Sequence, residues 1–115
     1  MTKHSKALEN FILSLSEARF YDAHEDLEEI WFPRRFEDTD EVNLLKGFIN
    51  AAVSFELRKK GREKASAKVW KNYIKYLPLL KTINSKHNKQ YQEIALHVEK
   101  ISYNLQNLIK EENDV

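Results

Sequence analysis

The stretch EVNLLKGFINAAVSFELRKKG, residues 41–61, decides the fold of this 115-residue chain. Apolar residues recur along it every three or four positions, which is the spacing of one face of a helix. Other apolar residues flank that stripe, and a helix that is apolar over so much of its circumference usually lies at the centre of a bundle. Gly61 suits the position just beyond the helix, where a left-handed backbone ends it. The stripe and its flanks comprise Leu44, Leu45, Phe48, Ile49, Ala51, Ala52, Val53, Phe55 and Leu57.

Four further helices are expected around this central one, and no strands. Thr2 or Ser5 suits the cap at the start of the first helix. Pro33 and Pro78 are expected to end or kink the second and the fourth, because proline cannot continue a regular helix. Helical spacing of apolar residues predicts the four over about 8–15, 18–32, 63–77 and 89–110.

Length and composition favour one domain. A chain of 115 residues can bury a single core, and two Gly and two Pro leave little material for long loops. The sequence therefore predicts an all-α, single-domain bundle of about five helices over residues 1–112, with a frayed tail at 113–115. Cysteine is absent, which excludes disulfides and thiolate zinc sites. The start of the chain has no signal-peptide pattern and no segment is apolar enough to span a membrane, so a cytoplasmic location is expected.

Charge is distributed unevenly along the chain. Residues 17–41 hold ten acidic and three basic side chains, whereas residues 58–89 hold eleven basic and one acidic. Helices of opposite charge can pack side by side within one molecule or between two. A homo-oligomer or another protein is therefore the expected partner.

The segment YDAHEDLEEIW, residues 21–31, carries one histidine and five carboxylates. On a helical wheel, four of the carboxylates point away from the apolar arc and are expected to face solvent: Asp22, Glu25, Asp26 and Glu29. The remaining one, Glu28, shares an edge with His24, one turn earlier. The predicted buried seam comprises Phe20, His24, Leu27, Glu28 and Trp31.

His24 and Glu28 form the candidate site. A histidine and a glutamate four residues apart can hold one metal ion, or can form a hydrogen bond along the helix. Position 28 is not histidine, so the zinc-protease pattern is not met, and a catalytic metal would need a third ligand. Glu56 falls in line with the apolar face of its helix and Asn50 lies toward the polar side. We therefore expect a polar cluster or pocket of His24, Glu28, Trp31, Asn50 and Glu56 that fixes helix packing.

The two blocks around these residues resemble a known family. HEDLEEIW is similar to the H-E-x-L-E-x-x-W segment of domain-of-unknown-function family 309, and the block from Lys46 to Leu80 is similar to that family's second conserved region. The resemblance implies a small all-helical domain without an established activity. The chain departs from the family pattern at Asn50, where members often carry glutamine, at Phe32, where an arginine commonly follows the tryptophan, and at Leu57, where many carry histidine.

Three functions fit these observations. The favoured one is a non-enzymatic binding or interaction module without a cofactor, because the chain has no phosphate-binding glycine loop, G-x-S-x-G elbow or cysteine nucleophile. The first alternative is a metal-binding protein or metal-dependent hydrolase that uses His24 and Glu28. The second is weak nucleic-acid binding through the basic face 58–75, although no recognised reading motif accompanies it. Its candidate phosphate contacts are Arg58, Lys60, Lys64 and Lys68.

Overall fold

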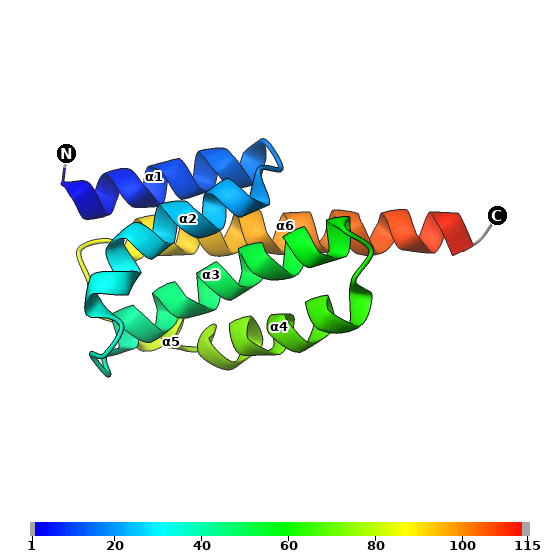
Figure 1. The fold of residues 1–115 in the computed structure, drawn as a ribbon. Helices are drawn as coiled ribbons and strands as arrows, with labels where there is room; N and C mark the ends of the chain where they lie inside the picture. Colours follow the sequence, from blue (N-terminus) through cyan, green and yellow to red (C-terminus); the bar gives the residue numbers. More distant parts are fainter. Residues whose placement is uncertain (1, 114–115) are drawn as a thin grey trace.

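The structure is a computed structural model that describes the backbone of residues 2–113 and the side chains of residues 2–106. The described chain is all-α, without a strand, and forms a single bundle in which the last helix projects beyond the others (Figure 1). Five long helices confirm the fold class predicted from the sequence. In chain order the elements are α1 (Lys3–Ser16), α2 (Phe20–Trp31), the 3₁₀ turn η1 (Phe32–Arg34), α3 (Asp40–Lys59), α4 (Glu63–Tyr76), α5 (Leu79–Thr82) and α6 (Asn88–Asn113).

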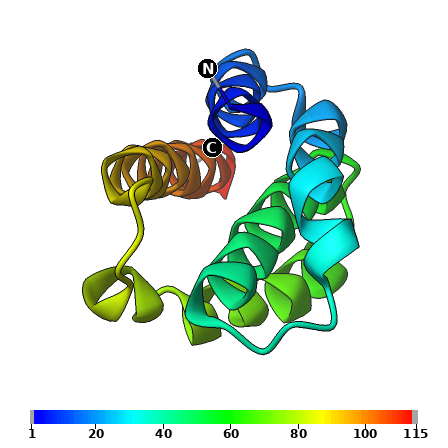
Figure 2. The same ribbon diagram turned by 90° about the vertical axis from the view of Figure 1, so that its left-hand side faces the viewer.

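Helix α3 lies between α2 and α4, as its broad apolar arc predicts (Figures 1 and 2). Its side chains Leu44, Leu45 and Phe48 are fully buried and join the core contributed by α1 and α6. Helix α6 packs on α1 and continues past the ends of α3 and α4. The bundle therefore covers α6 along only part of its length.

Local sequence signals set the ends of several helices. The hydroxyls of Thr2 and Thr39 accept hydrogen bonds from the backbone N–H groups of Ser5 and Val42, and so cap α1 and α3. Gly61 ends α3 with a φ of 78°, the left-handed conformation expected there. Ala18 takes the same role after α1 with a φ of 57°, although its Cβ disfavours that conformation.

The two prolines end α2 and α4, as the sequence predicts, and each lies beside a short helical segment. Pro33 lies within the 3₁₀ turn η1, because the amide hydrogen that proline lacks has no hydrogen-bonding role in the first turn of a new helical segment. Pro78 likewise separates α4 from the short helix α5, which the sequence pattern did not predict. α5 brings the chain back toward α6 (Figure 2).

Small residues allow α3 and α4 to approach closely. An added Cβ on Gly47 would lie 3.0 Å from the Cβ of Tyr76. Further along the same contact, Ser54 of α3 and Ser66 of α4 are both buried. Each hydroxyl donates to the other residue's backbone carbonyl, at 2.9 and 2.7 Å. Each buried hydroxyl thus has a backbone carbonyl as its hydrogen-bond partner in place of water. Larger side chains at these two positions would prevent the close contact of the helices.

The C-terminal end of α6 and the absence of a membrane-spanning segment were also predicted from the sequence. Helix α6 continues to Asn113, and residues 114–115 of the expected tail lie outside the described residues. Within the described residues, no helix has the length and apolar character needed to cross a bilayer.

Candidate functional site

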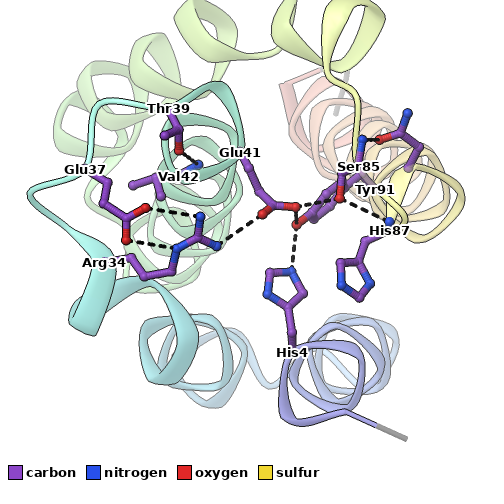
Figure 3. Close-up of polar contacts among 10 residues, drawn as sticks. His4, Arg34, Glu37, Thr39, Glu41, Val42, Ser85, His87 and Tyr91 are labelled. Atoms are coloured by element: carbon purple, nitrogen blue, oxygen red, sulfur yellow. Dashed lines mark hydrogen bonds and ion pairs between the residues drawn. The ribbon is translucent and has the colours of Figure 1, made fainter.

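One end of the bundle carries a network of polar side chains that centres on Glu41 (Figure 3). Glu41 lies in the first turn of α3, where a carboxylate is favoured by the helix dipole. It accepts hydrogen bonds from Ser85 at 2.6 Å, from Tyr91 at 2.8 Å and from Arg34 at 3.1 Å. The network therefore joins η1, α3, α6 and the loop before α6.

The hydrogen bonds decide the charge state of Glu41. Burial alone would raise its pKa, but the donors Ser85, Tyr91 and Arg34 outweigh burial and lower the pKa to about 2. The carboxylate is thus ionised at neutral pH and can only accept. Burial and the hydrogen bond to the Glu41 carboxylate together raise the pKa of Tyr91, so the hydroxyl keeps its proton and donates it to Glu41.

His4 extends the network to α1. Its Nε2 lies 2.7 Å from the Tyr91 hydroxyl, and because that hydroxyl gives its one proton to Glu41, Nε2 must be the donor. Burial and the neighbouring His87 lower the pKa of His4, which favours the neutral ring. The rings of His4 and His87 stack with centroids 4.2 Å apart.

The network is a structural link between helices distant in sequence, since its central groups already have hydrogen-bond partners in the chain. The network was not predicted from the sequence. His4 and His87 had no neighbours in the sequence that marked them, and Glu41 read as one acid among ten. The available signal was Tyr91, because a tyrosine on a core stripe needs a partner for its hydroxyl.

The predicted pair on α2 does form. His24 Nε2 lies 2.6 Å from Glu28 Oε1, one turn along the helix. The Glu28 side chain is 42% exposed, so the pair lies at the surface edge of the seam rather than inside it. Phe20 and Leu27 are buried as predicted, and Trp31 is half-buried with no hydrogen-bond partner for Nε1 among the described residues.

Glu56 and Asn50, which were predicted to join this pair, are bonded to other residues. Glu56 forms an ion pair with Lys60 at 3.4 Å, on its own helix. Asn50 accepts a hydrogen bond from Asn72 at 3.2 Å and so links α3 to α4. Within the described part of the chain, neither residue has a hydrogen bond or ion pair with His24 or Glu28, and no three His, Cys, Asp or Glu side chains form a group able to hold a metal ion.

One of the four carboxylates expected to face solvent has a different role. Asp26 is half-buried and accepts a 2.7 Å hydrogen bond from the buried hydroxyl of Ser14. Burial raises the pKa of Asp26, and the hydrogen bond from Ser14 lowers it in part. Helix α1 packs over this side of α2, which a wheel drawn for α2 alone does not include.

The basic face is also divided in the structure. Lys64 and Lys68 are exposed on α4, and Lys60 is exposed but paired with Glu56. Arg58 instead lies partly beneath the surface, with Nε buried. The four candidate phosphate contacts therefore differ in their exposure and in whether they already pair with an acidic residue.

A groove of about 1170 Å³ runs between α4 and α6, with α5 at one end. Ile74 is 49% exposed on one wall, and Leu96 and Tyr103 are 67% and 63% exposed on the other. Tyr73 is buried at the base, where burial, aided by the charge of Glu99, raises its pKa to about 12. The groove forms because α4 and α6 each pack on other helices more than on one another.

The fold and this surface define a small all-α protein with a helix-walled apolar groove. The family model described as Domain of unknown function (DUF309) matches residues 8–69, which is more than half of the chain, and the chain belongs to this family. That match confirms the resemblance seen in the sequence. No curated protein and no solved structure matches the chain. The family match ends within α4, so it does not include the α6 wall of the groove.

Proposed function

We propose that this protein is a non-enzymatic interaction module whose α4–α6 groove binds an amphipathic helix of a partner protein. The observation that supports this function is the groove itself, with Ile74, Leu96 and Tyr103 exposed together along it. Large apolar side chains that gather on one face of a small protein are typical of interaction sites.

The dimensions of the groove favour a helix over a small molecule. Its volume exceeds the roughly 300–1,000 Å³ of ordinary small-ligand pockets, and it is open along one side. The α6 residues that line it extend from Gln92 to Gln106, about 21 Å at the rise of an α-helix. A partner helix of about 14 residues with apolar side chains every three or four positions fits this length.

Other features of the molecule support a binding role rather than a catalytic one. The most closely linked titratable groups, Glu41, Tyr91 and His4, hold helices together through hydrogen bonds. The exposed apolar side chains of the groove have no such structural use. Their free energy of burial becomes available when a partner covers them.

A displayed peptide library tests this function. The library presents 14-residue helices with a fixed apolar stripe and randomised remaining positions, and is selected against the immobilised full chain. We expect enriched peptides to bind the wild type, and Leu96→Asp to weaken their binding at least tenfold. Leu13→Asp is the matched control, because Leu13 is 53% exposed but lies on α1, away from the groove.

Two results would contradict the function. One is the absence of any enriched sequence over several rounds of selection. The other is binding that Leu13→Asp weakens as much as Leu96→Asp does, since that result would place the peptides outside the groove. Circular dichroism of both variants checks that each keeps its helices.

A further inference from the structure

A second, smaller hollow of about 280 Å³ continues the groove at the end away from α5. The two hollows share Trp70, Ser102 and Gln106 in their walls. The character of the surface changes between them. The groove is mainly apolar, with Lys81, Glu99 and Lys100 at separate points along its walls, whereas Arg58 and Lys71 both line the smaller hollow and no acidic residue of the described chain does.

Arg58 has an unusual position in this hollow. Its Nε is buried, and among the described residues it has no hydrogen-bond partner. Within the same residues neither Arg58 nor Lys71 forms an ion pair, although surface cations elsewhere on the chain do. Two cations without acidic partners at one hollow favour an anionic group there.

We infer that the smaller hollow is an anion subsite that takes a carboxylate side chain from the helix bound in the groove. This inference rests on the proposed function. The guanidinium of Arg58 presents donors in a planar arrangement that matches a carboxylate, and the contact falls to its two terminal Nη groups, because Nε is buried. Lys71, exposed on α4 in the wall of the same hollow, adds a second positive charge.

The position of this subsite gives the groove a direction. Arg58 lies near the end of α3, beside Gln106, whereas Pro78 and Leu80 line the opposite end of the groove. Lys81 also lines that opposite end, but it is a single exposed cation, whereas Arg58 and Lys71 lie together at the subsite. A partner helix with an acidic residue at one end of its apolar stripe therefore favours the orientation that brings this residue to the subsite. An apolar stripe alone would leave both orientations similar in free energy.

The same displayed library tests the subsite, with the acidic residue as the readout. Among sequences enriched on the wild type, we expect Asp or Glu at one end of the apolar stripe. Synthetic peptides that differ only in Glu or Gln at that position should differ at least about tenfold in Kd, as a charge-assisted hydrogen bond implies. Arg58→Gln should remove this difference while the Gln peptide binds both proteins alike.

The outcomes separate the subsite from the groove. Enriched helices without an acidic preference overturn the subsite and leave the groove proposal intact. A preference that persists in Arg58→Gln also overturns it. No enrichment at all contradicts the proposed function, and the subsite with it. If a second copy of this chain fills the groove, sedimentation will show a dimer that Leu96→Asp dissociates, and that result overturns the partner helix proposed here. The acidic preference on the wild type needs no variant, so it remains a test if Arg58→Gln fails to fold.

Discussion

The hydroxyl of Tyr91 donates a 2.8 Å hydrogen bond to the carboxylate of Glu41, fifty residues earlier in the chain. The contact joins the first turn of α3 to α6, whose Tyr91 ring is fully buried. The same hydroxyl accepts from His4 on α1. One phenol thus connects three helices, and its partners account for the first two predictions.

Glu41→Gln tests the link through pH. The folded pKa of Glu41 is about 2, below its ordinary value of 4.5, so the carboxylate stabilises the fold above pH 4.5 and this contribution is lost as the pH falls toward 2. We expect the variant to lower the free energy of unfolding by about 2 kcal/mol at pH 7. Its stability should also depend less on pH between 4.5 and 2. Urea denaturation at several pH values measures both effects.

The control for this substitution is Glu37→Gln. Glu37 pairs with the same Arg34 but at the exposed surface, so its loss should cost less than about 1 kcal/mol. Equal pH dependence in Glu41→Gln and the wild type would contradict the assigned role of Glu41.

Tyr91→Phe keeps the buried ring and removes only the hydroxyl. Glu41 then loses one donor and His4 loses its acceptor, so we expect a loss of about 2 kcal/mol. In a double-mutant cycle with Glu41→Gln, the two effects should be coupled by about 1 kcal/mol. Strictly additive effects would show that the hydrogen bond does not contribute to stability.

The helix ends at Ala18 and Gly61 predict substitutions of opposite sign. Both residues have positive φ, and both turns carry the same pair of backbone hydrogen bonds, from Ala18 to Leu15 and Arg19 to Ser14 in the first. Ala18→Gly should raise the free energy of unfolding by about 1 kcal/mol, and with it the melting temperature, because glycine adopts this backbone without a Cβ clash. Gly61→Ala should lower stability by a similar amount. Changes of the same sign in both variants would contradict the argument.

The close contact of α3 and α4 predicts sensitivity to size at Ser54. Ser54→Val replaces the hydroxyl that donates to Ser66 with a methyl group and adds a second methyl group, so we expect a loss of about 2–3 kcal/mol. Ser54→Ala removes the hydroxyl alone and should cost about 1 kcal/mol. Ser16→Val, at an exposed position, is the control for the added methyl group. If the valine and alanine variants at position 54 are equally stable, the contact is not tightly packed.

The pair on α2 predicts a small effect. Glu28 is 42% exposed, and solvated pairs four residues apart contribute about 0.5 kcal/mol. Glu28→Gln should therefore lower the free energy of unfolding by less than about 1 kcal/mol in thermal denaturation. This difference from the wild type should become smaller as the salt concentration rises. A loss of several kcal/mol would show instead that Glu28 supports the core seam.

Much of the fold followed from periodicity. The apolar arc within residues 41–61 placed α3 at the centre, and Gly61 marked its end, because caps and stripes depend on neighbours within a few positions. The contact of His24 with Glu28 was predictable for the same reason. The side of α2 covered by α1 was not, and Asp26 was expected in solvent although it binds Ser14.

The sequence alone determined an all-α bundle, its five long helices, the central place of α3 and the family. Only the tertiary structure decided which distant residues meet. It brought Glu41 to Ser85 and Tyr91, paired Glu56 with Lys60, and left the groove between α4 and α6. The physical reason is range: helix formation depends on residues a few positions apart, whereas the network and the groove depend on how whole helices pack against one another.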